Sequence, residues 1–193
     1  MQNPSSIDAV LRRVNREAWV VTSSCGPRRG GLVATWVSEA SIDRQNPTML
    51  IGIAPNHFTA ELIDASRQFT LHLLRPDQVA MALNFASDSG RDRDKLADVS
   101  LSEASPPRLA DCAAWLRCEV FARLATGDRT YYWADVVYGQ NQSDGPCLRE
   151  AELIAAASDA QRQRLADNRA EDIQIHRPLL ASWRANLPEF LRP

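Results

Sequence analysis

The chain has 193 residues, which fits one domain plus an appendage and allows a substantial core without disulfides. Hydrophobic residues make up 45% and charged residues 24%, an ordinary globular composition. The net charge of −2 and the lack of a long basic run argue against a nucleic-acid or anionic-membrane surface.

The cysteines are spread along the chain and predict free thiols in a reducing compartment, since they form no Cys-x-x-Cys pair. Residues 1–19 contain no apolar stretch typical of a signal peptide. No run approaches the roughly 20 apolar residues of a membrane span. We therefore expect a cytoplasmic, soluble protein.

The first predicted elements are a short helix and two strands. The helix follows Ser5 and Ser6, either of which would cap it, and its apolar residues at helical spacing are Ile7, Val10, Leu11 and Val14. The strands are Trp19–Ser24 and Leu32–Ser41, separated by a turn over residues 25–31 that is rich in Gly.

The middle of the chain continues this pattern. The apolar run Met49–Ala54 predicts a strand buried on both faces, and Thr59–Ala65 predicts a helix. Phe69–Leu74 is the next predicted strand. Pro76 then opens a helix that runs through Phe85, since proline suits a first turn. Residues 86–99 are polar and predict a loop.

A long β-hairpin is predicted between Trp115 and Tyr138. Apolar and polar residues alternate from Leu116 to Leu124, residues 125–128 form the turn, and Tyr131–Tyr138 returns. These elements predict a mainly β fold, an antiparallel β-barrel with α-helical decoration, rather than alternating βαβ units.

The composition shifts after Gly145 and Pro146, and two helices are predicted at about 149–169 and 173–186. We therefore divide the chain into a barrel domain, 1–148, and a helical extension, 149–193. The extension carries an apolar stripe that would pack on the barrel or on a dimer partner, or form a lid over a cofactor; the stripe is Ile173, Ile175, Leu179, Leu180, Trp183 and Leu187.

The residue patterns give little support to metal or nucleophilic chemistry. His57, His72 and His176 are far apart, and none has a ligand partner at helical spacing, so no metal site is predicted. His72 lies in an apolar strand, which favours a structural role. The chain contains no Gly-x-Ser-x-Gly elbow, phosphate-binding P-loop or Gly-x-Gly-x-x-Gly loop.

The predicted strand ending at Ser41 mixes small hydroxyl side chains with Trp36. Thr35 and Ser38 are the other hydroxyl residues. An isoalloxazine ring needs donors and acceptors at its polar edge and apolar cover on its faces, which such a strand can supply. On composition alone, an amphipathic surface strand explains the pattern equally well.

Five segments, in order over about residues 19–139, resemble flavin reductase-like proteins, the FMN-binding split-barrel family. GLVATWVSEASID is similar to the family stretch GMTASWVTQVSFE. NHFTAELI resembles a segment ending T-x-E-L-I, and FTLHLL resembles F-x-x-N-x-L with His72 in place of Asn. The last two segments, FASDSGRDRDKLA and WLRCEV followed by Gly127-Asp128, resemble the family's SGRD loop and its hairpin with the triplet GDH.

The resemblance implies a split β-barrel that holds FMN, or FAD, between the subunits of a homodimer. The implied contacts to the flavin ring come from the strand: Thr35, Trp36, Val37, Ser38, Glu39 and Ser41. The implied phosphate site combines a helix N-terminus with the SGRD loop: His57, Phe58, Thr59, Ser89, Gly90, Arg91 and Lys95. Free N–H groups at a helix start favour an anion, and Arg and Lys pair with phosphate.

Plainer interpretations of these residues stay open. Thr59 would also serve as a simple N-cap, and Arg91 and Lys95 as a solvated charge cluster. Glu39 replaces the family's Gln or Ser, and its carboxylate would accept from flavin N3–H but oppose a reduced, anionic flavin. Arg129 replaces the GDH histidine; it would meet a nicotinamide phosphate or simply be an exposed turn residue.

The activity implied by the resemblance is reduction of flavin by NAD(P)H, with electrons passed to free flavin, an acceptor or a partner oxygenase. Hydride transfer needs no acid or base, so no catalytic residue is predicted. Two other functions are considered: an FMN-binding electron-transfer or carrier protein, favoured by Glu39 and by the missing histidine, and a flavin-dependent oxidase of a small substrate.

Overall fold

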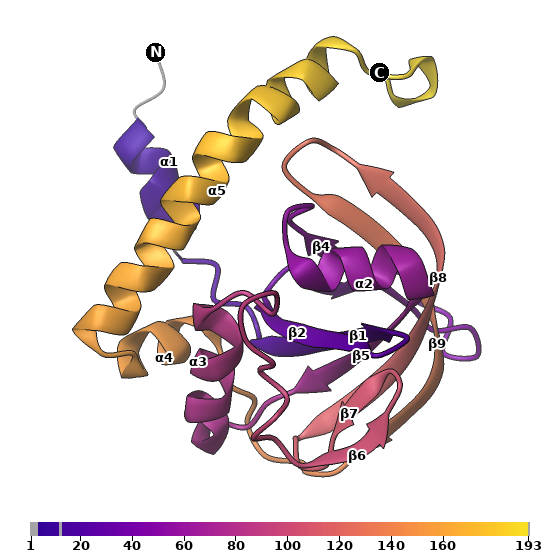
Figure 1. The fold of residues 1–193 in the computed structure, drawn as a ribbon. Helices are drawn as coiled ribbons and strands as arrows, with labels where there is room; N and C mark the ends of the chain where they lie inside the picture. The colour runs from indigo at the N-terminus through magenta and orange to yellow at the C-terminus, as the bar shows by residue number, and fades with distance from the viewer. Residues whose placement is uncertain (1–3, 12, 193) are drawn as a thin grey trace.

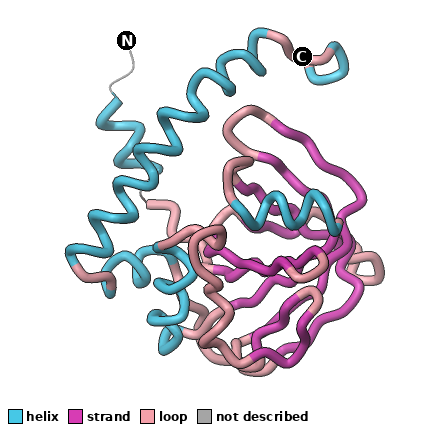
Figure 2. The backbone as a smooth tube through the Cα atoms, in the orientation of Figure 1, coloured by secondary structure: helices cyan, strands magenta, loops and turns pink. Residues whose placement is uncertain are grey.

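The computed structural model of the chain describes residues 4–11 and 13–192. Its centre is a curled antiparallel sheet that forms a half-barrel, with helices over one side and one end (Figures 1 and 2). The strand order is β2-β1-β5-β8-β9-β4-β3. The strands are β1 Trp19–Cys25, β2 Arg28–Ala34, β3 Val37–Glu39, β4 Thr48–Ile53, β5 Gln68–Leu73, β8 Ala114–Ala125 and β9 Thr130–Asn141.

The first hairpin is tighter than the sequence predicts. β1 and β2 pair along their whole length, from Cys25 opposite Arg28 to Trp19 opposite Ala34, so only Gly26 and Pro27 form the turn. The prediction of a turn over residues 25–31 is therefore wrong. Gly26 takes φ +59, a conformation that glycine adopts without a Cβ clash. The hairpin register then places Gly30 and Gly31 inside the ladder.

The strand predicted over Leu32–Ser41 is two strands. β2 ends at Ala34, and after Thr35 and Trp36 the chain continues as β3, which pairs with β4. Because β2 and β3 are the opposite edges of the sheet, Thr35 and Trp36 connect the two edges of the half-barrel. The amide of Gly52 on β4 donates to the Trp36 carbonyl at 2.9 Å, which fixes this crossing.

The predicted long hairpin is confirmed, and both of its strands are longer than expected. β8 and β9 pair from Ala125 opposite Thr130, next to the turn, to Ala114 opposite Asn141, and the pairing contains two register shifts. A second hairpin, β6 Leu101–Ala104 and β7 Pro107–Leu109, was not predicted from the sequence. Its strands have only four and three residues, too few to show the alternation that identifies a strand.

The helices cover the sheet in two places. α2 (Phe58–Ser66) lies inside the curl, whereas a 3₁₀ turn (Pro76–Gln78), α3 (Val79–Ser87) and α4 (Glu150–Ala156) lie at one end (Figure 1). The single helix predicted from Pro76 is therefore this 3₁₀ turn followed by α3. α1 (Pro4–Leu11) includes Ser5 and Ser6, so the predicted cap does not precede the helix.

The C-terminal helices differ from the prediction. The break falls at Ala157 and Ser158, and α5 then runs without interruption over Asp159–Ala185. Ser158 accepts from the amide of Gln161 at 3.2 Å, and the Gln161 side chain binds back, which forms a capping box. Residues 169–173 contain neither Gly nor Pro, so nothing ends the helix where the break was predicted. A second 3₁₀ turn (Glu189–Leu191) follows.

Two clusters form the core, one inside the curl under α2 and one between the sheet, α3 and α4. His72 is fully buried beside the second cluster, where Nδ1 donates to the Val20 carbonyl at 3.0 Å and Nε2 accepts from the Leu109 amide at 3.1 Å. Burial lowers its pKa to about 4, so the ring is neutral near neutral pH. The predicted structural role of His72 is thereby confirmed.

No described helix has both the length and the apolar character that crossing a membrane would require. All of the cysteines are free: Cys25, Cys112, Cys118 and Cys147.

Candidate functional site

A pocket of about 130 Å³ opens where the two edges of the half-barrel meet. The end of β2, the connecting residues, the end of β4 and the turn of the long hairpin line it. The lining residues are Leu32, Val33, Ala34, Thr35, Trp36, Gly52, Ile53, Ala54, His57 and Arg129. Two residues implied as ring contacts, Thr35 and Trp36, are thus brought together with one implied at the phosphate end, His57.

Trp36 forms an aromatic wall of this pocket. Its ring is stacked near Tyr131 at 6.5 Å between centroids and 19° between planes. The guanidinium of Arg129 lies 4.7 Å from the Trp36 ring centroid, while its Nη1 donates to the Asp128 carbonyl at 2.7 Å. A Cβ at Gly52 would lie 3.1 Å from Tyr131 and 3.3 Å from Trp36, so glycine lets both rings approach β4.

The start of α2 supplies hydrogen-bond donors beside the pocket. His57 is the N-cap, with extended backbone, and its carbonyl accepts from the amides of Ala60 and Glu61. The N–H groups of Phe58 and Thr59 therefore come before the first amide that donates within the helix, that of Ala60, at the positive end of the helix. Thr59 is buried and is the second residue of the helix, so its interpretation as an N-cap is wrong.

The Ser89-Gly90-Arg91 segment lies against the same helix start. Arg91 donates from Nη1 to the Asn56 carbonyl at 2.9 Å and forms an ion pair with Glu61. Its guanidinium lies 5.8 Å from the centroid of Phe58, and a Cβ at Gly90 would lie 2.8 Å from the same ring. Glycine at position 90 is thus what permits this close packing.

Ser89 Oγ accepts from the Arg91 amide at 3.1 Å. The fold therefore brings the two segments implied at the phosphate together: His57, Phe58 and Thr59 with Ser89, Gly90 and Arg91.

Lys95 lies apart from this cluster. It is 4% exposed, and its Nζ donates to the carbonyls of Phe85 at 2.7 Å and Asp88 at 2.8 Å, at the end of α3. Burial lowers the pKa of its ammonium to about 8. In this arrangement Lys95 binds free carbonyls at a helix C-terminus rather than an external anion.

The remaining residues implied as ring contacts lie beyond Trp36, on β3 or, for Ser41, just after it, and are not among the pocket's lining residues. Ser38 and Glu39 are exposed, and Glu39 forms an ion pair with Arg44. Ser41 Oγ accepts from the amide of Asp43 at 3.1 Å. Val37 pairs with Ile51 at the sheet edge. The Arg44 pair partly compensates the charge of Glu39.

Comparison with known proteins identifies the family. Residues 11–151, most of the chain, match the model of the flavin reductase like domain. The chain belongs to the flavin reductase-like domain family. The family resemblance in the sequence analysis and the predicted split-barrel fold are therefore confirmed.

Two curated relatives of this flavin reductase-like protein differ in how much of their own length this chain matches. The reductase component of 4-nitrophenol 4-monooxygenase/4-nitrocatechol 2-monooxygenase from Rhodococcus opacus is 32% identical over 114 residues, covering 58% of this chain and 60% of that protein. Diflavin flavoprotein A 1 from Synechocystis sp. is 25% identical over 139 residues, covering 70% and 24%. The chain spans about a quarter of the length of its diflavin relatives.

Among solved structures, the flavin reductase domain protein from Arthrobacter sp. FB24 matches with a TM-score of 0.67 at 23% identity. The match covers 76% of this chain and 90% of that one. Such a likeness supports the fold rather than a particular activity.

Sequence reasoning missed two residues near the site of this flavin reductase-like domain, Asp172 and His176 on α5. Asp172 Oδ2 lies 3.4 Å from His57 Nε2, and both α5 residues contact Asn56. The hydrogen bond from Asn56 to Asp172 joins residues 116 positions apart. Helical periodicity gives no signal for a polar contact of this kind.

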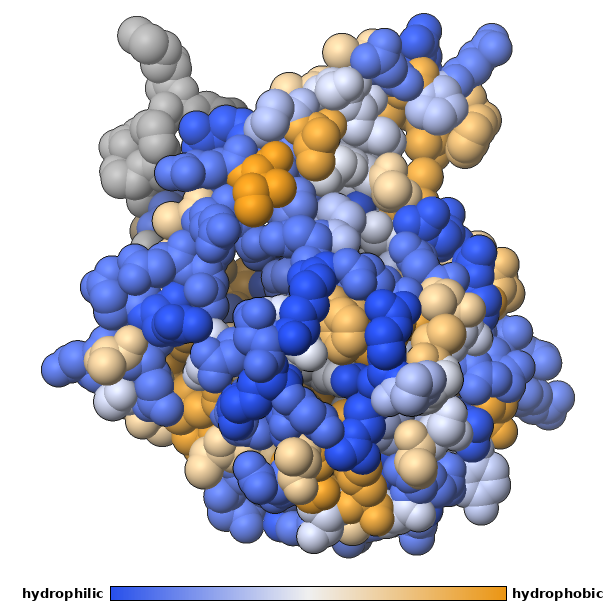
Figure 3. Space-filling view, in the orientation of Figure 1, coloured by the Kyte–Doolittle hydropathy of each residue, from blue (hydrophilic) through white to orange (hydrophobic). Residues whose placement is uncertain are grey.

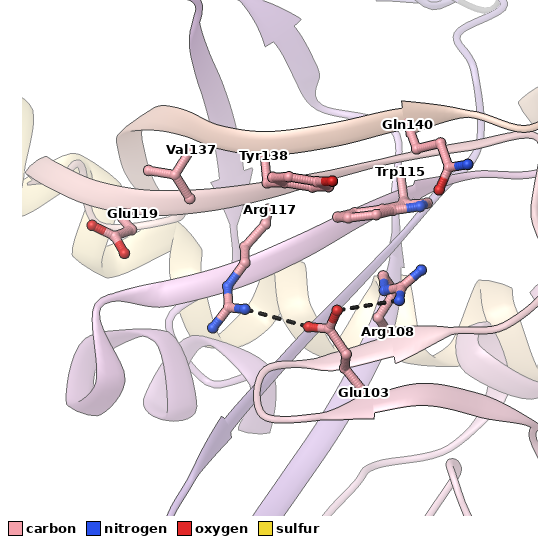
Figure 4. Close-up of a pocket in the computed structure, with 8 residues that line it drawn as sticks. All are labelled: Glu103, Arg108, Trp115, Arg117, Glu119, Val137, Tyr138 and Gln140. Atoms are coloured by element: carbon pink, nitrogen blue, oxygen red, sulfur yellow. Dashed lines mark hydrogen bonds and ion pairs between the residues drawn. The ribbon is translucent and has the colours of Figure 1, made fainter.

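A larger cavity, about 440 Å³, lies elsewhere, on the long hairpin beside β6 and β7 (Figure 4). Glu103 bridges Arg108 at 3.1 Å and Arg117 at 3.3 Å, and the Trp115 ring lies between Arg108 and Tyr138. The charged groups and rings pair with one another, while Arg108 Nε and Trp115 Nε1 are buried without a hydrogen-bond partner. Within the described residues, no group of three or more His, Cys, Asp or Glu side chains is placed to hold a metal ion.

Proposed function

We propose that this protein binds FMN and reduces flavin with NAD(P)H, passing the electrons to free flavin, another acceptor or a partner oxygenase. The main supporting observation is that Trp36, His57 and Arg129, from three distant segments, line one pocket beside the donor-rich start of α2. The Rhodococcus relative, the reductase component of a monooxygenase, supports an oxygenase as partner.

The donor set fits the two ends of FMN. The isoalloxazine would contact Thr35, Trp36 and the backbone of Gly52–Ala54, which can cover its face and pair with its polar edge. The phosphate would be held by the α2 amides, the Thr59 hydroxyl and Arg91. When bound, FMN supplies the hydride acceptor for nicotinamide. The protein's own contribution is to orient the two rings and to exclude water, and we assign no side chain an acid–base role.

The size of the pocket supports a homodimer. Sites that enclose a cofactor usually measure about 300–1,000 Å³, whereas this one measures about 130 Å³. One chain would therefore enclose part of the flavin, and a second subunit would cover the rest. Trp36 is 40% exposed on the rim of the pocket, and a second subunit would cover it.

One observation favours a second candidate, an FMN-binding electron-transfer or carrier protein. Arg129, which lies over Trp36, stands where the family motif has the GDH histidine, and the loss of that histidine favours the carrier. FAD in place of FMN is an alternative cofactor for either function. A cytoplasmic location suits both, because unpaired thiols persist in a reducing compartment.

The test is steady-state oxidation of NADH and of NADPH with FMN, FAD or no added flavin. We expect oxidation that needs added flavin and is faster with one of the two nucleotides. Tight flavin binding without nicotinamide oxidation would favour the carrier. Oxygen consumption that needs a small organic substrate but no nicotinamide would favour an oxidase.

A further inference from the structure

Helix α5 contacts the loops around the pocket mainly through polar side chains on one face. The helix is hydrophilic overall, with separate hydrophobic side chains at the surface of the molecule (Figure 3). Ile173, Ile175 and Leu179 are 42–48% exposed. The contacting polar residues recur at intervals of four, so they lie on one face. They are Arg164 and Asn168 on the end of α3, followed by Asp172 and His176 on the Asn56–His57 segment.

Asn56 is held at three points. Its Nδ2 donates to Asp172 Oδ1 at 2.9 Å, its Oδ1 accepts from His176 Nε2 at 2.9 Å, and its carbonyl accepts from Arg91. His176 is 2% exposed, so its bond to Asn56 is shielded from water. The backbone that leads into α2 is thereby fixed from α5 on one side and from the Arg91 loop on the other.

The Asp172 carboxylate also faces His57. The 3.4 Å between Asp172 Oδ2 and His57 Nε2 is the distance of an ion pair or a long hydrogen bond, and the side chains are 24% and 41% exposed. The interaction with His57 lowers the pKa of Asp172 to about 2, helped by the bond from Asn56. Because Nε2 faces Asp172, Nδ1 of the same ring is left for a partner in the pocket that His57 lines.

We propose that Asp172 is a positioning residue that orients His57, and that the His57 ring, with a proton on each nitrogen, donates from Nε2 to Asp172 and from Nδ1 to an anionic oxygen of the bound flavin. Of the chain's three histidines, His57 is the one that lines the pocket. This inference rests on the proposed function, because it needs a flavin in that pocket. It gives α5 a specific role, which is to preorganise the binding segment.

The test is a double-mutant cycle on flavin affinity, measured by the change in flavin fluorescence. We expect Asp172→Asn and His57→Gln each to weaken FMN binding about three- to fivefold, the range for a partly exposed charged pair. The double variant should bind no more weakly than His57→Gln, since Asp172 acts through His57. Asp167→Asn is the matched control, because Asp167 is exposed on the same helix and pairs with Gln163.

Comparing FMN with riboflavin, which lacks the phosphate, shows which flavin oxygen accepts the hydrogen bond from His57. Losses for FMN alone place it on the phosphate, whereas equal losses for both flavins would overturn the inference, because the ring of oxidised flavin carries no anionic oxygen. Fully additive losses in the double variant, or unchanged binding in Asp172→Asn, would overturn the inference while leaving the proposed function intact.

Nitrogen NMR of the His57 ring in the flavin-free protein tests the contact by itself. Asp172→Asn should shift the His57 signals, and Asp167→Asn should leave them in place. Signals unchanged by Asp172→Asn would contradict the positioning role even before flavin is added. A wild-type chain that binds neither flavin overturns the proposed function and the role of His57 together.

Discussion

The guanidinium of Arg129 lies 4.7 Å from the centre of the Trp36 ring, across the mouth of the half-barrel. The contact joins the turn of the long hairpin to the two residues that connect the sheet edges, so it closes the pocket on one side. An interaction of this kind between exposed groups contributes about 0.5–1 kcal/mol. Arg129 is therefore part of the pocket wall, not a freely exposed turn residue.

Replacing Trp36 with Ala should weaken FMN binding about three- to tenfold, because aromatic packing on a flat ring contributes about 0.5–1.5 kcal/mol. Titration of flavin fluorescence measures the change. Phe190→Ala is the control, since Phe190 is 82% exposed near the C-terminus. Equal affinities in wild type and Trp36→Ala would place the flavin elsewhere.

Arg91→Gln should weaken FMN binding about tenfold and leave riboflavin binding unchanged, because a charged donor to phosphate is lost. Isothermal titration with both flavins measures the difference. Arg93→Gln is the matched control, since Arg93 is bound to Asn84 and Asp88 instead of the α2 start. A similar loss for riboflavin would show that Arg91 acts on the loop structure or the ring.

Lys95→Met should lower the free energy of unfolding by about 1–3 kcal/mol, because two buried carbonyls lose their charged donor. Its effect on FMN affinity should stay within about twofold. Urea unfolding and flavin titration measure the two quantities. A large loss of affinity with unchanged stability would instead show that Lys95 leaves Phe85 and Asp88 to meet the phosphate, as the family resemblance implies.

Stability should fall by about 3 kcal/mol as the pH drops from about 6.5 to about 4, because the pKa of His72 is lowered to about 4 in the fold. Between these values the unfolded chain binds a proton that the native His72 does not, so acidification favours unfolding. Below pH 4, protonation of Asp172, whose pKa is lowered to about 2, continues the loss.

The measurement is urea unfolding at several pH values, with His72→Asn as the comparison. That variant should lose most of the slope between pH 6.5 and 4, whatever its absolute stability. A slope that persists in His72→Asn would assign the acid sensitivity to other groups.

Local patterns predicted much of this fold. The alternation from Leu116 to Leu124 identifies β8, and the run Met49–Ala54 identifies β4, because side-chain periodicity reports which face is buried. The break after Ala34 was not predictable in this way. It depends on a hydrogen bond from Gly52 to Trp36 across the sheet, which no local pattern contains.

The candidate site was likewise predicted only in part from the sequence. The resemblance selected Thr35, Trp36, His57 and Arg91, and the fold brings their segments together, but their contact with a flavin stays a prediction. Lys95 sits in the same motif, yet its ammonium meets the carbonyl end of α3. Asp172 lies outside the matched residues, so its contact with His57 emerged only from the fold.

The reductase function is tested by anaerobic addition of NADH or NADPH to the FMN-reconstituted protein. We expect the visible absorption of the bound flavin to bleach rapidly with one nucleotide and more slowly with the other. A bound flavin whose visible absorption persists with both nucleotides would contradict the reductase.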